Sequence, residues 1–327
     1  MSRVNAVQVH KDGGPEELRY EEIEIGEPGT GEVRVRHSAI GLNFTDIHHR
    51  TGRYPAGHFP HGIGMEAAGV VETVGPDVTD IRAADRVAYL APRPGTYAQA
   101  RIVPAARLIK LHDWLSDETA AAALLKGLTA QYLLRGAYPV RAGETILIHA
   151  AAGGVGLIMC QWARHLGAHV IGTVSTPEKA TLAREHGCDE PIIYTQEDVV
   201  DRVRELTNGS GLPVVYDSVG ATTFEQSLKC LHRRGMLVSF GSASGPAPPL
   251  ELFRLNRMGS LYVTSAGLAD YTHNRAELLA RAAELFEVLR SGAVKVTIAK
   301  RYALADAARA HEDLESRRNT GSAILIP

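Results

Sequence analysis

The chain has 327 residues, of which 45% are hydrophobic and 22% charged. This length allows about two domains, and the composition is typical of a globular protein, which excludes a disordered tail, a collagen and a coiled coil. The formal charge is −2, from 35 basic and 37 acidic residues, so no electrostatic footprint for nucleic acid or an anionic membrane is expected. Cys160, Cys188 and Cys230 are too few and too widely spaced for a disulfide framework. We therefore expect a reducing compartment, namely the cytoplasm.

The first third of the chain is predicted to be β-rich. Polar and apolar residues alternate over 32–36, and further strands are expected at 67–74 and 86–90. Turn signals separate these strands, for example Gly75-Pro76-Asp77. Short strands with this punctuation favour a barrel or a sandwich.

Strand-like and helix-like segments alternate after residue 117, following a helix expected at 120–134. Strands are expected at 145–149, 170–174, 191–194, 214–216, 237–240 and 261–264, and helices at 155–166, 178–186, 198–207 and 224–231. Several of the strands are short apolar runs, as in a parallel sheet that is covered on both faces. This alternation predicts a doubly wound α/β domain.

The tail is predicted to contain helices at 275–290 and 305–315 and strands near 294–298 and at 322–326, and to return to the first domain. No secretory signal is recognised over 1–14. The apolar stretch 145–163 approaches the length of a membrane span, but it holds His149 and three glycines. A strand, a tight turn and a helix explain it better than a membrane span, and we expect no contact with a membrane.

A glycine-rich turn follows the apolar strand 146–148 and opens a helix. In a G-x-G-x-x-G alignment Ala151, Gly153 and Gly156 take the three small-residue positions. Gly153 would let the backbone approach a pyrophosphate, and Gly156 would let the helix pack on the strand. The amides at the helix start, which includes Gly154 and Val155, would bind the phosphates. Because strand, turn, helix and second strand occur in order, the pattern predicts a dinucleotide site.

The second strand of this unit, 170–174, indicates the cofactor. A site for NAD usually has an acidic residue at the tip of this strand, and here Ser175 and Thr176 stand there instead. Ser175 can donate to a 2′-phosphate and Lys179 can pair with it, which favours NADPH. Glu178 is the dissenting residue, because its carboxylate can reach a ribose instead.

Several motifs along the chain are similar to those of the quinone oxidoreductase group, the zeta-crystallin-like branch of the medium-chain dehydrogenase/reductase superfamily. The motifs lie at 39–46, 64–69, 125–130, 149–156, 215–220 and 239–241 and between 314 and 327. The resemblance extends over essentially the whole chain, and it is closest to the bacterial NADPH:quinone reductases.

This resemblance implies a fold and an assembly. A co-chaperonin-like β-rich catalytic domain would comprise residues 1–124 and 267–327, and a Rossmann domain with a doubly wound parallel sheet would comprise 125–266. It also implies a homodimer joined through the edge strands of two Rossmann sheets.

The same resemblance bears on metal binding. Where alcohol dehydrogenases of this superfamily place cysteine and histidine ligands of a catalytic zinc, this chain has Asn43 and Met65. We therefore expect no metal, and we interpret His48, His49, His58 and His61 as a polar loop. Without a Lewis acid, the substrate has to accept hydride readily, as quinones and activated alkenes do.

Residue roles also follow from the resemblance. Asn43 would hydrogen-bond near the nicotinamide ribose or the substrate oxygen, Asp46 would orient the same network, and Tyr54 would pack against the quinone or donate a proton. Further cofactor contacts are carried over to Thr129, Tyr194, Ser218, Phe240, Gly241, Ser242 and Arg317. Tyr54 can also be a plain loop anchor, Asn43 and Asp46 can simply bond their own turn, and Phe240 can belong to the core.

Three functional hypotheses remain at this stage. The first is an NADPH-dependent reductase of a small quinone, with hydride or single-electron transfer left open. The second is an NADPH-dependent reductase of activated C=C bonds in alkenals, enones or enoyl thioesters. The third is a non-catalytic NADPH-binding or RNA-binding protein, against which the balanced charge argues.

Overall fold

The computed structural model describes residues 2–316 and 321–327, and they divide into two compact units. Unit 1 comprises Met1–Leu125 and Val296–Pro327, and unit 2 comprises Lys126–Lys295. The tail therefore does return to the first unit, but the second boundary lies after Lys295 and not at residue 266. Helix α9 (Arg275–Arg290) belongs to unit 2, where Arg281 donates to Gln131 over 2.7 Å.

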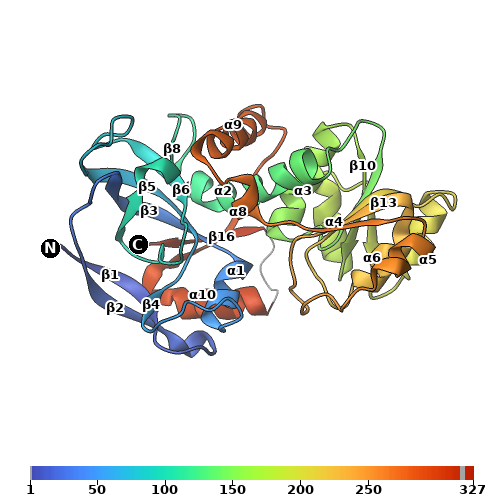
Figure 1. Ribbon diagram of the computed structural model, residues 1–327, viewed down its shortest axis with the longest axis horizontal. Coiled ribbons are helices and arrows are strands. Elements are labelled where there is room, and N and C mark those ends of the chain that lie inside the picture. The colour runs from blue at the N-terminus through green and yellow to red at the C-terminus, as the bar shows by residue number, and fades with distance from the viewer. Residues whose placement is uncertain (1, 317–320) are drawn as a thin grey trace. The chain divides into compact units, whose positions relative to one another are not determined.

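Unit 1 is built mainly from strands (Figure 1). They are β1 (Ser2–Val9), β2 (Leu18–Ile25), β3 (Glu32–Leu42), β4 (His61–Gly62), β5 (Glu66–Val74), β6 (Arg86–Leu90), β7 (Ala100–Pro104), β8 (Leu108–Lys110), β15 (Ile298–Ala303) and β16 (Ser322–Ile326). Among the described residues they form one sheet in the order β2-β1-β4 and a second in the order β15-β16-β3-β5-β6-β8, with β7 paired to β3. The predicted strands at 86–90 and 322–326 have the expected bounds.

Short helices complete unit 1. They are η1 (Pro15–Glu17), α1 (Phe44–Arg50), η2 (Ala105–Arg107), η4 (Leu304–Asp306) and α10 (Ala307–Glu315). The strand expected near 294–298 is wrong in position. The amide of Val294 bonds the carbonyl of Val288 and closes α9, and β15 begins only at Ile298, where pairing with β16 starts.

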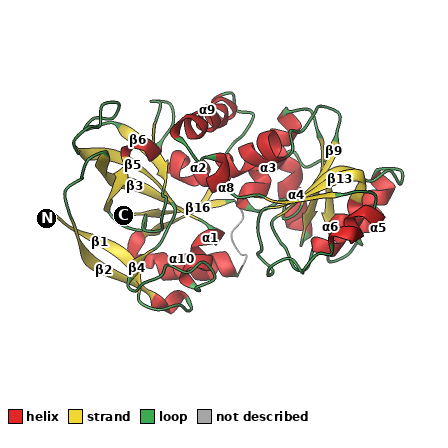
Figure 2. Ribbon diagram, viewed as in Figure 1, coloured by secondary structure: helices red, strands yellow, loops and turns green. Residues whose placement is uncertain are grey.

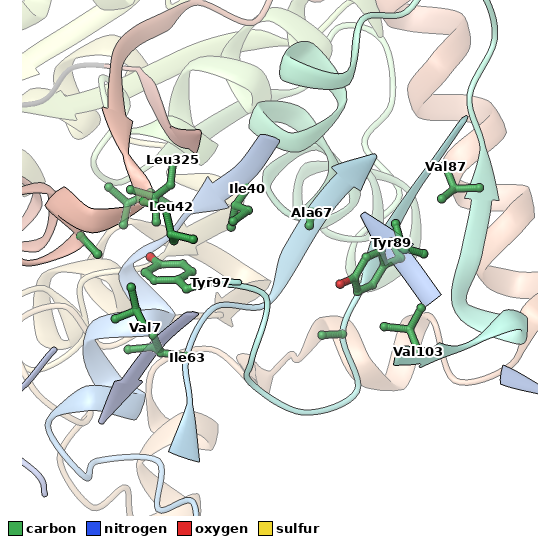
Figure 3. Close-up of a cluster of buried hydrophobic side chains, with 14 of the residues drawn as sticks. Val7, Ile40, Leu42, Ile63, Ala67, Val87, Tyr89, Tyr97, Val103 and Leu325 are labelled. Carbon is green, nitrogen blue, oxygen red and sulfur yellow. The ribbon is translucent and has the colours of Figure 1, made fainter. Parts of the chain in front are cut away.

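One apolar core fills unit 1. Figure 3 shows Tyr97 between Val7, Ile63 and Leu42. Inward-facing residues of β1, β3, β5 and β6 and of the C-terminal β16 share this core, so the two ends of the chain fold as one body.

Unit 2 alternates strands and helices along most of its length (Figure 2). Helix α2 (Asp117–Tyr132) spans the boundary between the units. The remaining elements are η3 (Leu133–Ala137, a π-helical turn), β9 (Thr145–Ile148), α3 (Gly154–His165), β10 (His169–Val174), α4 (Pro177–Glu185), β11 (Glu190–Ile193), α5 (Val199–Leu206), β12 (Leu212–Asp217), α6 (Phe224–Cys230), β13 (Leu231–Ser239), α7 (Leu252–Arg257), β14 (Tyr262–Ser265), α8 (Leu268–Tyr271) and α9.

The sheet of unit 2 has the order β11-β10-β9-β12-β13-β14 in the described chain, and its pairs are parallel. The chain leaves β9 toward β10 on one side and later returns to β12 on the other. This is the strand order of a Rossmann fold, and it places the switch point at the carboxyl end of β9. The predicted fold class of this unit is confirmed.

His37 on β3 makes the stability of the protein depend on pH. Its Nδ1 donates to the carbonyl of Ala98 over 2.7 Å, and its Nε2 accepts from the hydroxyl of Tyr89 over 2.7 Å. Burial lowers the pKa of His37 to about 4. The pKa of this histidine in the unfolded chain is about 6.5. Below that pH the unfolded chain therefore binds more protons than the folded one, and the free energy of unfolding decreases as the pH falls.

We expect the free energy of unfolding to fall between pH 6.5 and 4, with His37 contributing up to roughly 1.4 kcal/mol per pH unit. Urea denaturation at several pH values measures this slope. The His37→Gln variant should lose that part of the slope, and His58→Gln, at an exposed position, should keep it. Equal slopes for wild type and His37→Gln would contradict the assignment.

Candidate functional site

The glycine-rich turn lies where β9 meets α3. Ala150 has a left-handed backbone with φ of 54°, and its carbonyl accepts the amide of Gly153 over 2.9 Å. A Cβ on Gly156 would clash with the carbonyl of Ala150 and lie 2.7 Å from that of Ala151. Gly153 is the N-cap of α3, and no side chain caps this helix. The first amides of α3 are thus presented close to a turn that requires glycine at position 156.

The tip of the second strand places Ser175 directly after β10. Thr176 caps α4, because its hydroxyl oxygen accepts the amide of Lys179 over 3.3 Å. A hydrogen bond from Thr176 lowers the pKa of Glu178, so this carboxylate is ionised and bound back onto the cap of its own helix. Ser175 and the partly buried Lys179 lie at the same tip.

Other predicted contacts follow the carboxyl ends of neighbouring strands. Tyr194 follows β11, is 45% exposed, and bonds the carbonyl of Val174 through its amide. A Cβ on Gly241 would lie 2.7 Å from the carbonyl oxygen of Ser218, so the loops after β12 and β13 touch there. Phe240 continues this contact, since its amide bonds the carbonyl of Asp217 over 2.9 Å.

Ser242 belongs to the same loop as Gly241, and its carbonyl accepts the amide of Gly245 over 3.0 Å. Thr129 lies on α2 and is 8% exposed. Arg317 lies outside the described residues.

Asn43 and Asp46 lie in unit 1 at the start of α1, and both are buried. Nδ2 of Asn43 donates to Oε1 of Glu66 over 2.7 Å, and the backbone amide of Asn43 donates to Oδ2 of Asp46 over 2.8 Å. Glu66 also accepts the amide of Leu125 over 2.6 Å. Asn43 and Asp46 form a capping box at the start of α1, so both residues bond their own turn. The side-chain amide of Asn43 is in addition held by Glu66 from another strand.

A directed chain of hydrogen bonds ends at Asp46. A guanidinium can only donate, so Nδ1 of His311 accepts from Arg50 over 3.1 Å and its Nε2 carries the proton. That nitrogen lies 3.2 Å from the hydroxyl of Tyr97, which in turn donates to Asp46 over 3.0 Å. Burial, reinforced by Arg50, lowers the pKa of His311 to about 3 and keeps it neutral. Glu315 pairs with Arg50 over 2.7 Å at the outer end of the chain.

Tyr54 is 42% exposed and is held between two imidazoles. Its ring meets that of His48 edge-on at 5.1 Å and that of His49 at 5.5 Å, measured between centroids. Burial lowers the pKa of both histidines, so neutral rings flank the tyrosine. This arrangement gives Tyr54 a defined position with part of its surface open to solvent.

The cluster of His48, His49, His58 and His61 bears on metal binding. Among the described residues, no group of three or more His, Cys, Asp or Glu side chains is arranged to hold a metal ion. In the same part of the chain, no helix is both long and apolar enough to cross a bilayer.

The sequence patterns do not predict a role for Tyr97, His311 or Arg50, and Glu66 is predicted only as part of the motif at 64–69. Arg50 and His311 are 261 positions apart, so no local pattern links them.

The chain is similar to known proteins in both sequence and structure. Residues 29–113 match the family described as alcohol dehydrogenase GroES-like domain, and residues 154–284 match the family described as zinc-binding dehydrogenase. The first match covers most of the N-terminal part of unit 1 and agrees with the predicted co-chaperonin-like fold.

Full-length relatives were also found. A quinone oxidoreductase of Pseudomonas aeruginosa is 53% identical over 98% of this chain and 99% of its own length. A 2-haloacrylate reductase of a Burkholderia species is 46% identical over 99% of both chains. Among solved structures, Escherichia coli quinone oxidoreductase complexed with NADPH has a TM-score of 0.97 at 48% identity, covering 99% of this chain and 100% of that one.

Gly156→Ala should weaken NADPH binding by about tenfold or more, because the added methyl group pushes α3 away from the turn. Fluorescence titration with NADPH measures the dissociation constant. Gly26→Ala is the matched control, since nothing lies within 4 Å of a Cβ at Gly26. Unchanged affinity in Gly156→Ala would show that this turn does not hold the cofactor.

Proposed function

Because the chain belongs to the quinone oxidoreductase family of the medium-chain dehydrogenase/reductase superfamily, we propose that it reduces a small quinone with NADPH. The observation that carries the proposal is the tight turn at Gly156, which presents the uncapped start of α3 at the carboxyl end of the central strand. It occurs in a chain that matches quinone oxidoreductases from end to end. In the net reaction NADPH, one proton and the quinone yield NADP⁺ and the hydroquinone.

The residues present fit a dinucleotide phosphate cofactor. The first amides of α3 would bind the pyrophosphate, and Gly153 lets the backbone come close to it. Ser175 and Lys179 would hold a 2′-phosphate, while Glu178 is engaged with Thr176. When bound, the cofactor would supply the hydride. Tyr194, Ser218, Phe240, Gly241, Ser242, Thr129 and Arg317 are its further proposed contacts.

Asn43, Asp46 and Tyr54 are proposed to act on the substrate side. Glu66 accepts the side-chain amide of Asn43 and fixes this side chain, which would hydrogen-bond near the nicotinamide ribose or the substrate oxygen. Asp46 fixes the backbone of Asn43 and is itself fixed by Tyr97. Tyr54 would pack against the quinone ring or give its hydroxyl proton to the reduced oxygen. Positioning and the exclusion of water are what such residues contribute when the cofactor supplies the chemistry.

A second candidate function is the reduction of an activated C=C bond. Its support is the 2-haloacrylate reductase that is 46% identical over the whole length. This reaction would use the same cofactor site and would differ only in the substrate pocket.

The test follows NADPH consumption at 340 nm by the purified protein under anaerobic conditions. Phenanthrenequinone, 2-chloroacrylate and a simple enone serve as acceptors, and NADH serves as the control donor. We expect rapid turnover with the quinone and NADPH, and turnover at least about tenfold slower with NADH, as the loss of one phosphate contact predicts. Turnover with the acrylate or enone alone would support the second candidate, and none with any acceptor would refute both.

We also propose that the protein works in the cytoplasm and without a nucleic-acid partner. Cys160, Cys188 and Cys230 are free and buried, as expected in a reducing compartment. The balanced charge of the chain supports the second statement.

A homodimer through the edge of the Rossmann sheet is a further part of the proposal. Leu252, Phe253 and Tyr262 are the most exposed large hydrophobic residues of the described chain, at 78%, 61% and 56%, and they lie in α7 and β14. Strand β14 ends the sheet on this side, and the opposite edge strand, β11, contains Pro191, which has no amide to donate. We therefore propose that β14 pairs with β14 of a second copy.

Tyr262→Glu should convert the dimer to a monomer at micromolar concentration, because it places a charge at the proposed contact. Sedimentation velocity should give twice the mass of one chain for wild type and a single chain mass for the variant. Tyr20→Glu alters a similarly exposed tyrosine of unit 1 and should leave the dimer intact. A monomeric wild type would refute the proposal.

A further inference from the structure

Five buried polar side chains are connected to the glycine-rich turn by hydrogen bonds and have no role so far. They are His149, Thr173, Asp217, Thr223 and Ser227, and none is more than 9% exposed. His149 follows β9, Thr173 lies on β10, and Asp217 ends β12. Thr223 is the N-cap of α6, and Ser227 lies within this helix. Buried polar groups cost folding free energy unless they are paired, so their partners matter.

The hydrogen-bond directions in this group are fixed by Ser227. Its hydroxyl lies 2.9 Å from Oδ2 of Asp217 and 2.8 Å from the carbonyl oxygen of Thr223, and both of these are acceptors. Ser227 must therefore donate to one of them, and it can only accept from Nε2 of His149, at 3.0 Å. The proton of His149 thus sits on Nε2.

Nδ1 of His149 is then an acceptor. The hydroxyl of Thr173 donates to it over 2.9 Å, and the same oxygen accepts the amide of Ala150 over 3.3 Å. Ala150 is the residue of the turn with φ of 54°. The turn therefore has an anchor on β10 that depends on a neutral imidazole, and burial lowers the pKa of His149 although Asp217 opposes this.

The other end of the chain of bonds organises the loop after β12. Asp217 accepts the amides of Val219 and Gly220 over 2.8 and 3.0 Å and the hydroxyl of Thr223 over 2.7 Å. The backbone of β9 is bonded to β12 as far as His149, whose amide reaches the carbonyl of Tyr216. Side chains then continue the connection between the turn and this loop.

We propose that Thr173, His149, Ser227 and Asp217 are positioning residues that hold the glycine-rich turn and the loop after β12 in the relative geometry that binds the dinucleotide. The inference rests on the proposed function. It adds that this buried chain sets cofactor affinity and leaves the rate of the chemical step unchanged, because its hydrogen bonds join the glycine-rich turn, β10, β12 and α6.

Thr173→Val keeps the side-chain shape and removes the hydroxyl. We expect the dissociation constant for NADPH, measured by isothermal titration calorimetry, to rise about 5- to 10-fold, with kcat at saturating NADPH within about twofold of wild type. Thr173→Ser returns a hydroxyl and should restore affinity. Thr207→Val is the matched control, because its hydroxyl bonds the carbonyl of Val203 at the end of α5 and lies outside the chain of bonds.

Ser227→Ala interrupts the chain at its other junction and supplies an independent test should Thr173→Val fail to fold. The double variant with Thr173→Val and Ser227→Ala should lose less binding free energy for NADPH than the sum of the losses in the two single variants, because both hydroxyls bond His149. Melting temperatures of all variants accompany the titrations.

The outcomes are distinguishable. Unchanged affinity in Thr173→Val and Ser227→Ala, with a wild type that binds NADPH, would overturn this inference alone. Equal weakening in Thr207→Val would overturn it also, because it would show a general effect of lost stability. A wild type that does not bind NADPH would overturn the proposed function and this inference together.

Discussion

The packing of α3 against the carboxyl end of β9 is the contact on which the rest of unit 2 depends. A Cβ at Gly156 would meet the carbonyls of Ala150 and Ala151, so the helix can begin this close to the strand only at glycine. The close start aims the helix along the sheet and leaves its first amides at the switch point, between β10 and β12. Ala150 in the same turn has a left-handed backbone, which costs free energy unless neighbours hold it. The amide of Ala151 on the carbonyl of Thr173 is one such restraint.

Buried polar chains recur in both units, and in each one a group of fixed protonation sets the direction. In unit 1 Arg50 can only donate, which defines the proton of His311 and, through it, that of Tyr97. In unit 2 Ser227 lies between two acceptors, which defines the proton of His149. A network in which every hydrogen bond has only one possible direction allows fewer side-chain arrangements than an apolar contact of the same size. It therefore restricts the conformation of the backbone that it bonds more strongly. Asn43 in one unit and the glycine-rich turn in the other are the backbones held in this way.

The sequence predicts the parts of this protein whose cause is local. The periodic helix 275–290 and the strands 86–90 and 322–326 have their expected bounds, because a continuous apolar pattern and flanking turn residues define them. Strands β1 and β2 were not predicted individually, since β2 packs one face only partly and carries three glutamates. The alternation of Val294 and Val296 predicts strand β15 too early in the chain, because Val294 in fact closes α9. The glycine-rich turn is a local signal, but the bond between His149 and Ser227 joins residues 78 positions apart and needs the folded sheet.

Asn43 and Met65 are the two residues predicted to stand at the positions of cysteine and histidine ligands of a catalytic zinc. In Gly64-Met65-Glu66 the carboxylate of Glu66 faces into unit 1 and accepts the amide of Asn43 and the backbone of Leu125. The side-chain amide of Asn43 thus donates to Glu66, and the thioether of Met65 is only a weak acceptor. These side chains lack the thiolate and imidazole donors that a catalytic zinc prefers. The proposed reaction, in which a quinone or an activated alkene takes up hydride, needs no Lewis acid.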